Sequence, residues 1–467
     1  METILIKALQ LLCCLSLLVV LHEGGHFFFS KLFKVRVEKF YLFFNPKFHL
    51  FSTKDKWFAK RFPKIAARET EYGIGWIPLG GYVKISGMID ESMDKEQLKQ
   101  PAQPWEFRSQ PVWKRFFIMV GGVLMNLITS IVIYCAIMFT WGQKVMPMKT
   151  INDNGGFVFN DMAKSYGFQD RDKLIALDGD TIKYWDNSII RPLSEAKTAT
   201  VIRNGKMMDI RIPEHEENMI DFSEMYPPLM QPYITAEIDS VMPGSPAEKA
   251  KLTRGYVITK INDATINSWA DIDSVKYTIL KKLAEPCSKA DSVALRKMNI
   301  LCYDKRSDTN LPFAADLELD KEYNIGIVKK TLSLDTLNYS FVGCIPAGTS
   351  YGWKQLKGYV HDLKYIFTKK GANSVGSFIT IGSIFPDAWD WQQFWHLTAL
   401  ISIILAVMNI LPIPGLDGGH VMFLLLEAVM GRPLSEKAQT WCEYFGMGLL
   451  ILLMIWAFGN DLFKFVF

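Results

Sequence analysis

The sequence predicts a multi-domain α + β protein: a membrane domain of four helical spans with a membrane-associated β-loop, and small β-rich domains inserted between spans two and three. Four apolar stretches are long enough to cross the hydrocarbon core of a bilayer, which takes about 20 residues. The region between the second and third stretches instead shows short alternating runs broken by Gly, Pro and Asp or Asn, a pattern typical of small β domains.

Composition excludes several classes of protein. Hydrophobic residues make up 49% of the 467 positions and charged residues 21%, which excludes a disordered, collagen-like or disulfide-scaffold chain. The net charge of +4 is small and dispersed, whereas a nucleic-acid-binding domain needs a basic stripe, so no nucleic-acid partner is expected. Cys287 and Cys302 fall in one polar region, and the sequence leaves open whether they pair.

The N-terminal membrane part covers residues 1–141, with spans at about 4–29 and 116–141. The first span is not a cleavable signal peptide, because its apolar run is too long and lacks a small-x-small cleavage site. The loop 31–115 holds 17 Lys or Arg against 9 Asp or Glu, whereas residues 142–393 hold 31 against 32. The positive-inside rule therefore places this loop in the cytoplasm and the long central region outside.

The central region divides into two predicted domains, 142–228 and 229–339. Stretches beginning at Asp161 and Val241 form a weak internal repeat, and each resembles the helix, turn and strand of a PDZ domain. PDZ domains bind extended peptides by adding a strand to a sheet edge. The repeat therefore predicts a size filter or tether for protein or peptide ligands, with plain spacer domains as the alternative.

Residues 340–393 are expected to form an amphipathic interfacial region. From Tyr351 to Phe367, aromatic and aliphatic residues recur at helical spacing with lysines between them. Such a helix lies at a membrane interface with its aromatic rings at headgroup depth, or packs against the preceding domain. The C-terminal membrane part, 394–467, holds the remaining spans at about 394–414 and 443–460.

The motif His22-Glu23-Gly24-Gly25-His26 lies inside the first apolar stretch. Residues four apart share a helix face, so the two imidazoles can hold one Zn²⁺ while Glu23 reaches a water molecule beside it. Charged groups in an apolar helix cost about 2.5 to 3.5 kcal/mol each on insertion scales, so a functional role is the default. The alternative is a set of satisfied core residues in a transport or structural helix.

Two histidines do not complete a catalytic zinc site, which normally has three protein ligands and one open position. We expect Asp417 as the third ligand, within NILPIPGLDGGH at residues 409–420. Prolines and a glycine between 412 and 415 break the helix, and such backbone is tolerated at membrane depth where it lines a water cavity. His420 is the rival ligand.

These two motifs together resemble the intramembrane site-2 zinc metalloproteases, and the tandem PDZ copies resemble their bacterial regulator-of-sigma-E protease branch. The likeness covers nearly the whole chain, including a GIGWIPLGGYVKI stretch that resembles the family's membrane-reentrant β-loop, at about 71–86. Gly121-Gly122 and Asn126 stand where the family usually has Gly-Pro and Asn. Gly24 replaces a residue that is often bulkier, and we expect it to permit close helix packing.

The resemblance implies a zinc metalloendopeptidase that acts in regulated intramembrane proteolysis. Its substrates would be single-span membrane proteins, either anti-sigma factors or remnant signal peptides, already shortened by another protease. Zn²⁺ would be held by His22, His26 and Asp417, with Glu23 as general base and Asn409 holding the substrate or the oxyanion. The implied location is the bacterial inner membrane, crossed several times, with the PDZ domains extracytoplasmic and periplasmic in a Gram-negative cell.

The loop glycines are expected to supply a strand edge for a substrate segment that must become extended before cleavage. These glycines are Gly73, Gly75, Gly80 and Gly81. A simple cytoplasmic hairpin is the alternative.

Two other function classes stay open at this point. A zinc transporter would need a continuous polar path, and the sequence shows no further intramembrane His or carboxylate cluster. A catalytically inactive adaptor would hold clients through its PDZ domains, but it would not need the complete His-Glu-His and Asp set. Proteolysis is therefore the favoured function.

Overall fold

The computed structural model describes residues 2–78, 80–88, 101–186, 189–215, 219–285, 289–307, 311–320, 323–374 and 376–466. These residues form two compact units, Met1–Gln143 with Asn338–Phe467, and Lys144–Leu337. Both helices and small sheets are present, as the α + β prediction requires.

Four long helices of the first unit are apolar and long enough to cross a membrane, as predicted. They are α1 (Glu2–Leu32), α5 (Val112–Thr140), α16 (Trp391–Ile410) and α18 (Glu436–Val466). The third ends at Ile410 rather than near 414, because Pro412 and Pro414 follow directly. Helices α1 and α18 bury little of their apolar surface inside the protein, which fits contact with lipid.

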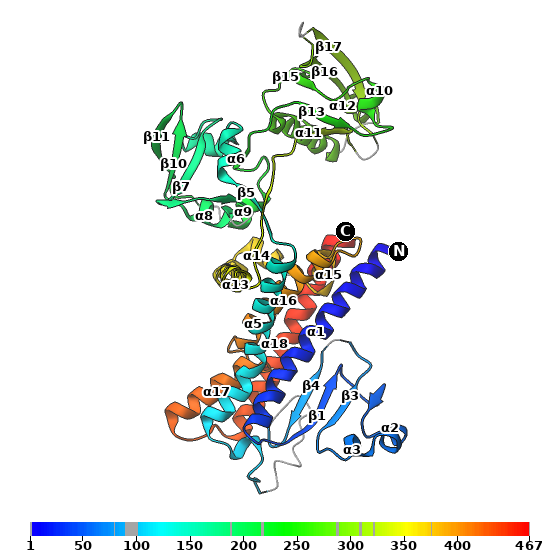
Figure 1. The fold of residues 1–467 in the computed structure, drawn as a ribbon, viewed down its shortest axis with the longest axis vertical. Helices are drawn as coiled ribbons and strands as arrows, with labels where there is room; N and C mark the ends of the chain where they lie inside the picture. The colour runs from blue at the N-terminus through cyan, green and yellow to red at the C-terminus, as the bar shows by residue number, and fades with distance from the viewer. Residues whose placement is uncertain are drawn as a thin grey trace. The chain divides into compact units, whose positions relative to one another are not determined.

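Helix α5 lies at the centre of this unit and packs along α1, α16, α13 (Cys344–Asp362) and α17 (Asp417–Met430) (Figure 1). A Cβ atom added at Gly25 would lie 2.2 Å from the carbonyl oxygen of Gly121, so these two glycines let α1 and α5 touch backbone to backbone. The expectation that Gly24 supplies close packing is wrong. A Cβ atom there would meet nothing within 4 Å, because Gly24 lies on a different face of α1.

A four-stranded sheet, in the order β2-β3-β1-β4, packs beside these helices. Strand β1 runs parallel to β3 and antiparallel to β4, and β4 stands at one end of the described strand order. Val37 and Ile85 of the sheet share a buried cluster with Ile118 of α5 and Leu424 of α17. The strand bounds are Val37–Leu42 for β1, Phe51–Ser52 for β2, Glu71–Ile74 for β3 and Tyr82–Ile85 for β4.

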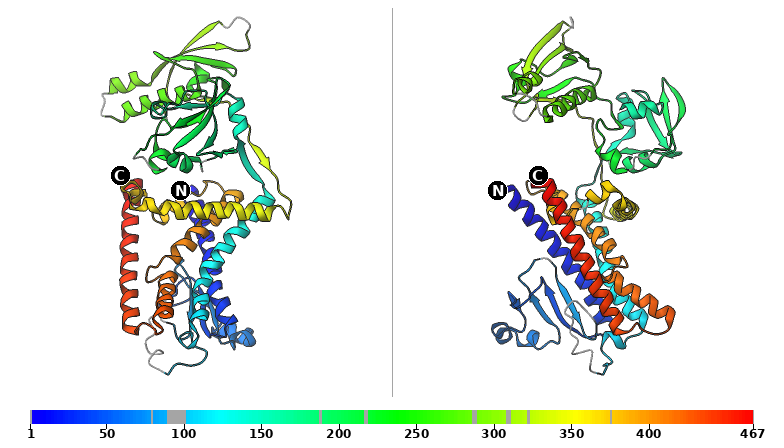
Figure 2. Two further views of the ribbon diagram at one scale, coloured as in Figure 1. Left: turned by 90° about the vertical axis from the view of Figure 1, so that its left-hand side faces the viewer. Right: turned by 180° about the vertical axis from the view of Figure 1, so that it is seen from behind.

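The predicted helix at 351–367 begins earlier and changes type: α13 starts at Cys344, and a 3-10 turn covers Leu363–Phe367. Helix α13 runs crosswise to the long helices (Figure 2). Gly348 brings it against the backbone of Cys135 on α5, where a Cβ atom would lie 2.5 Å away. Short helices α14 (Lys369–Ser374) and α15 (Phe378–Ser383) lead to α16.

The second unit contains two separate hydrophobic cores, one in each half of its sequence. The first half contains β5 (Gln143–Pro147), α6 (Met148–Asp153), β6 (Phe157–Phe159), α7 (Asp161–Ser165), β7 (Lys173–Leu177), β8 (Asp180–Thr181), β9 (Tyr184–Trp185), α8 (Ile190–Glu195), β10 (Thr198–Arg203), β11 (Lys206–Arg211), α9 (Met219–Glu224) and β12 (Met230–Pro232). The second half contains β13 (Ile238–Val241), α10 (Pro246–Lys249), β14 (Tyr256–Ile261), β15 (Ala264–Thr265), α11 (Trp269–Ala284), α12 (Lys289–Arg296), β16 (Lys297–Asp304), β17 (Pro312–Glu318) and β18 (Ile327–Lys329). Strand β19 (Asp335–Leu337) returns to β5, so the chain leaves this unit beside the strand by which it entered.

The internal repeat has the same local structure in both copies. In each, a short helix is followed by a turn and a strand: α7 and β7 in the first copy, α10 and β14 in the second. Asn160 caps α7 by accepting a bond from the amide of Ala163, and Ser245 caps α10 in the same way. The helix, turn and strand expected from the sequence are therefore present. Cys302 is buried in β16, while Cys287 lies outside the described residues, so its pairing stays open.

Candidate metal centre

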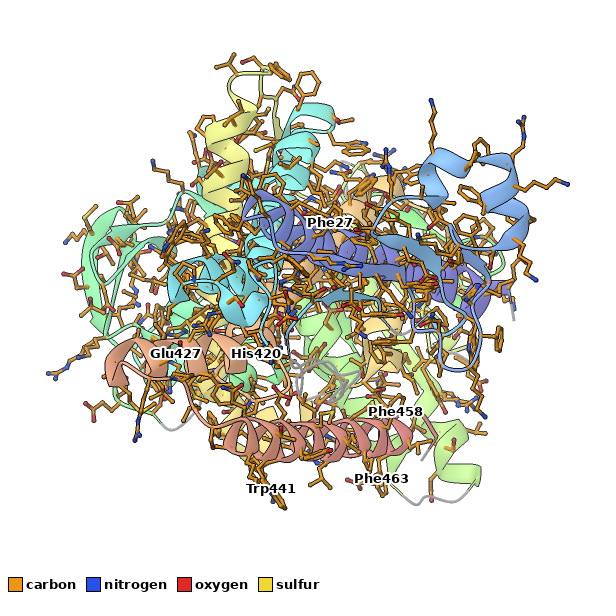
Figure 3. All side chains as sticks on the ribbon, turned by 90° about the horizontal axis from the view of Figure 1, so that it is seen from below. Phe27, His420, Glu427, Trp441, Phe458 and Phe463 are labelled. Atoms are coloured by element: carbon orange, nitrogen blue, oxygen red, sulfur yellow. The ribbon has the colours of Figure 1, made fainter. Side chains whose placement is uncertain are left out.

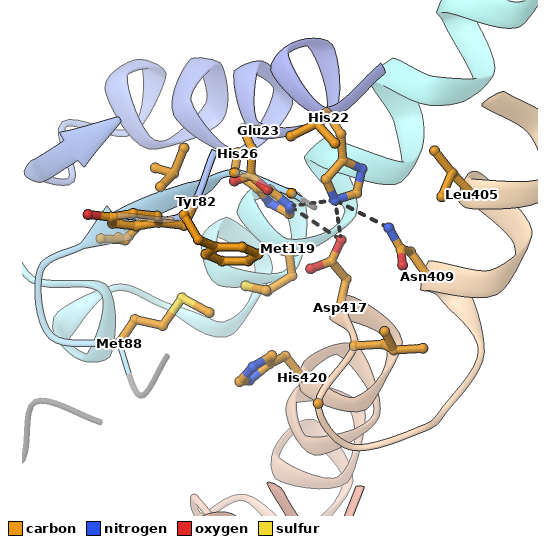
Figure 4. Close-up of a pocket in the computed structure, with 18 of the residues that line it drawn as sticks. His22, Glu23, His26, Tyr82, Met88, Met119, Leu405, Asn409, Asp417 and His420 are labelled. Carbon is orange, nitrogen blue, oxygen red and sulfur yellow. Dashed lines mark hydrogen bonds and ion pairs between the residues drawn. The ribbon is translucent and has the colours of Figure 1, made fainter. Parts of the chain in front are cut away.

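Three of the predicted ligands meet at one point, although they come from opposite ends of the chain (Figure 4). The Nε2 atoms of His22 and His26 lie 3.3 Å apart. Oδ2 of Asp417 lies 3.2 Å from the first and 3.3 Å from the second. Asp417, the third ligand expected from the sequence, therefore lies beside both histidines.

The donor atoms are arranged as a metal ion requires. Tetrahedral zinc with bonds of about 2.0 to 2.1 Å separates its ligand atoms by about 3.3 Å, which matches the three spacings above. Oδ2 of Asp417 is also buried and has no hydrogen-bond partner of its own. A buried carboxylate oxygen between two imidazole nitrogens needs a positive charge, and two histidines with one carboxylate suit zinc.

Residues of α5 contact both histidine rings and orient them. Nδ1 of His26 lies 2.8 Å from the carbonyl oxygen of Ile118, which therefore accepts its proton and leaves Nε2 for the metal. Gly122 makes room for both rings, since a Cβ atom there would lie 2.5 Å from His26 Nε2 and from His22 Cε1. The glycine pair in the second span thus serves two purposes, helix contact at Gly121 and ring clearance at Gly122.

Asn126 of α5 contacts Nδ1 of His22, as the Ile118 carbonyl contacts Nδ1 of His26. The orientation of the Asn126 amide determines which of its atoms faces the ring. The amide nitrogen is placed 3.1 Å from His22 Nδ1, while the amide oxygen is buried without a partner. The two ends of an amide are assigned from their surroundings. Turning this one over lets the oxygen accept a proton from Nδ1 and leaves Nε2 unprotonated, as metal binding requires.

The break after α16 positions Asp417 as the first residue of α17. Gly415 has φ of +90°, a left-handed conformation that favours glycine. Gly418 and Gly419 then allow the first turn of α17 to pack against the preceding loop, where Cβ atoms would lie 2.1 and 2.7 Å from carbonyl oxygens of that loop. A carboxylate at a helix N-terminus is also stabilised by the helix dipole. The local sequence thus explains the placement of the third ligand.

A cavity of about 700 Å³ opens beside the three ligands. Glu23 and Asn409 both line it, and Nδ2 of Asn409 lies 3.4 Å from His22 Nε2. His420 lines the same cavity but does not join the ligand group (Figure 4). Its Nε2 lies 3.7 Å from Oε1 of Glu443 on α18.

Sequence reasoning missed Glu443. His420 and Glu443 line the cavity from two different helices, so a further His and carboxylate pair lies beside the ligand group. One signal pointed to this residue: Glu443 is an acid at the start of a predicted span.

The four loop glycines occupy two different environments. Gly80 and Gly81 line the cavity together with the edge strand β4. Gly73 lies in β3, an interior strand, where a Cβ atom would lie 2.2 Å from the ring of Tyr41. Gly75 packs against the backbone of Phe44. In the described part of the sheet, the edge strand beside the metal centre is therefore β4, whereas Gly73 and Gly75 serve packing.

A centre built from two histidines and a carboxylate, beside a glutamate and between membrane-length helices, is the arrangement of a membrane metalloprotease. The chain belongs to peptidase family M50, whose sequence profile matches residues 10–453. The site-2 proteases form this family, so the resemblance seen in the two motifs is confirmed. The rival transporter and adaptor functions are not favoured.

Relatives match this chain from end to end. The regulator of sigma-E protease of Escherichia coli is 28% identical over 96% of both chains, and that of Haemophilus influenzae is 28% identical over 96% of both. A Neisseria meningitidis protein whose name describes it as a zinc metalloprotease is 27% identical over 97% of this chain and 98% of its own.

Proposed function

We propose that this membrane metalloprotease hydrolyses peptide bonds in or beside the membrane segments of other proteins, at a zinc centre held by His22, His26 and Asp417. One observation supports this most strongly: the three donor atoms converge with spacings of 3.2 to 3.3 Å, although Asp417 lies almost 400 residues from the two histidines in sequence. Zinc bound there supplies Lewis acidity, which polarises a carbonyl group and makes water a nucleophile near neutral pH.

Glu23 acts as the general base and then as the general acid. It takes a proton from the attacking water as the oxygen bonds to the carbonyl carbon. It then gives that proton to the amide nitrogen as the carbon–nitrogen bond breaks, so an acid and an amine are the products. Asn409 lines the same cavity, where its amide can donate a hydrogen bond to the carbonyl oxygen as negative charge develops.

The edge strand β4 holds the substrate in an extended form. A helical substrate hides its amide bonds, so a short part of it must unwind before cleavage. Tyr82 and Val83 of β4 line the cavity, and among the described residues β4 pairs with β1 alone. An added substrate strand would satisfy the other side by main-chain hydrogen bonds and would lie beside the metal centre.

The names of the relatives support a particular substrate class. Proteins named regulator of sigma-E protease act in a pathway that controls a sigma factor, which points to membrane-bound anti-sigma factors as substrates. We therefore propose single-span membrane proteins, previously cut by another protease, with remnant signal peptides as a second group. The chain then lies in the bacterial inner membrane with loop 31–115 in the cytoplasm, as its excess of Lys and Arg indicates.

The second unit would act outside the membrane as two PDZ-like domains, about 142–228 and 229–339. The repeated helix, turn and strand around α7 and α10 support this assignment. Such domains bind extended peptides or exclude bulky substrates. The region 340–393 would lie at the membrane surface, which the exposed Trp353 and Phe367 of its helices support.

The function is tested with truncated single-span membrane proteins, incubated with wild type and with Glu23→Gln in detergent. We expect fragments cut near the membrane segment with wild type alone, and normal zinc content in both proteins. Equal cleavage by both would exclude Glu23 as the base. Cleavage by neither, at full zinc occupancy, would count against the substrate class rather than against the metal centre.

The role of the second unit needs a separate test. Deletion of residues 144–337 should let the enzyme cut uncleaved, full-length substrates that the complete protein rejects. Unchanged rejection would show that this unit does not filter by size.

A further inference from the structure

A short segment at one edge of the first unit's sheet carries basic and aromatic side chains together. It comprises residues 54–68, and it includes α2 (Lys56–Arg61) and α3 (Pro63–Ala66). It holds six Lys or Arg and a single acid, Asp55. Figure 3 shows nitrogen-tipped side chains extending away from these pale-blue helices. We refer to it as the α2–α3 segment.

Large apolar side chains of this segment are also exposed. Trp57 is 63% exposed, Phe62 44% and Ile65 38%. Just outside the segment, the exposed rings of Phe48 and Trp76 stack with their centroids 5.2 Å apart. Single exposed apolar residues are ordinary, but a group of them among cations indicates an interaction surface.

Internal contacts hold this surface in shape. The Lys54 ammonium group donates to the carbonyl oxygens of Ala66 and Arg68, at 2.6 and 2.8 Å, and so ties the start of the segment to its end. Phe58 packs edge-on against Phe51 of β2. The Trp57 ring also lies beside these rings, with its centroid 5.9 Å from that of Phe51 and 5.6 Å from that of Phe58, while most of its surface stays exposed.

The segment lies at the level where two membrane-length helices end and begin. The segment lies level with the end of α1 and the start of α5 in Figures 1 and 2, and both helices belong to the same unit. Helices that cross a membrane begin and end at its headgroups, where Trp residues concentrate and where Lys and Arg meet anionic phosphates. The sheet lies between this segment and the metal centre, because β2 and β4 are opposite edges.

We propose that the α2–α3 segment docks on anionic phospholipid headgroups, with Trp57 and Phe62 at interface depth and Lys60, Arg61 and Lys64 on the phosphates. Charge complementarity favours a lipid surface, since the exposed side chains of residues 56–68 include five cations and no acid. Docking would fix the sheet, and with it the edge strand β4, at a set height relative to the membrane.

Hydrogen exchange of the full-length protein tests this in nanodiscs of phosphatidylcholine, alone and with phosphatidylglycerol added. Amides of residues 54–68 should exchange about fivefold more slowly in the anionic discs, the effect of one well-placed cation at such a surface. Lys60→Glu/Arg61→Glu/Lys64→Glu should abolish this lipid dependence. The matched control Lys206→Glu/Lys249→Glu/Lys260→Glu, on exposed positions of the second unit, should retain it.

Two results would overturn the proposal. Equal exchange rates in both kinds of disc would show that the segment does not bind anionic headgroups. A soluble protein would then be the expected partner of this surface. Lipid dependence that persists in the charge-reversed protein would place the contact elsewhere. Hydrogen exchange in the second unit shows whether each variant is folded. The measurement does not depend on proteolytic activity, so it is independent of the proposed function.

Discussion

Arg115, near the start of α5, and Glu427, near the end of α17, form an ion pair with two parallel contacts. Nη2 lies 2.5 Å from Oε1 and Nη1 lies 3.0 Å from Oε2. Both side chains are only 13% exposed. Helix α5 supplies the groups that orient the histidines, and α17 begins with Asp417. This pair therefore joins the two halves of the metal centre.

Breaking the pair should loosen the centre. Arg115→Ala leaves the Glu427 carboxylate largely buried without its partner, which typically destabilises a protein by about 3 to 5 kcal/mol. We expect lower zinc occupancy and a lower unfolding temperature in detergent. Arg115→Lys keeps the charge but loses the two-pronged geometry, so its effect should be intermediate. Full zinc content and normal activity in Arg115→Ala would contradict this role.

Asn126 should contribute to zinc affinity without touching the metal. Asn126→Ala removes the partner of His22 Nδ1, and loss of such a partner usually weakens metal binding about 10- to 100-fold. Asn126→Asp should bind zinc almost as well as wild type if the side chain accepts the Nδ1 proton. Titration against a competing chelator measures both. An aspartate variant as weak as the alanine variant would show that the amide donates instead.

Two glycines on facing helices should respond in opposite ways to alanine. Gly122→Ala places a methyl group 2.5 Å from both imidazoles and should abolish activity and zinc binding. Gly24→Ala meets nothing within 4 Å, and the better helix propensity should stabilise α1 by about 1 kcal/mol. Zinc content and unfolding temperature separate the two effects. A harmless Gly122→Ala would mean that the rings are placed differently.

The edge strand should contact the substrate during cleavage. A photo-crosslinking amino acid at Val83 of β4 is expected to capture a substrate fragment in the Glu23→Gln background. The same group at Ile74, exposed at the end of the interior strand β3, serves as the control. Capture at Ile74 and not at Val83 would disprove strand addition at β4.

Acid should weaken the sheet through Glu71. Its Oε1 accepts hydrogen bonds from Tyr41 at 2.5 Å and Ser52 at 2.6 Å. Burial alone would raise the pKa of Glu71, but these bonds hold the pKa below its usual value. The carboxylate therefore stabilises the fold fully above the unfolded-state pKa of about 4.3, and this contribution disappears as the pH falls through the folded-state pKa.

We expect the wild type to lose more stability than Glu71→Gln as the pH is lowered from about 6 to 3. Hydrogen exchange of the β3 and β4 peptides measures this difference. Parallel pH profiles for the two proteins would count against the prediction.

Much of the fold could be predicted because its signals are local. The membrane helices show as long apolar runs, although the prediction extended the third span to about 414, beyond the end of α16 at Ile410. The helix, turn and strand of each repeat are also set by neighbouring residues. The ligands were predictable for the same reason: His22 and His26 are four residues apart on one helix, and Asp417 follows an evident helix break.

Other parts of the site depend on residues that are distant in sequence. Asn126 and His22 are 104 residues apart, and Arg115 and Glu427 are 312 apart. Periodicity cannot assign such pairs, because many polar residues in the chain are equally suitable partners. The position of Glu443 also depends on distant residues, because the packing of α18 brings it to the cavity.

The glycines of the first motif separate what the sequence determines from what the tertiary structure determines. The sequence alone determined that two histidines, a glutamate and two glycines share one helix, and that an aspartate at the far end of the chain could complete a zinc site. The tertiary structure decided that Gly25, and not Gly24, faces Gly121. Neighbouring helix residues point about 100° apart, so only the rotation of α1 against α5 selects which one makes the contact.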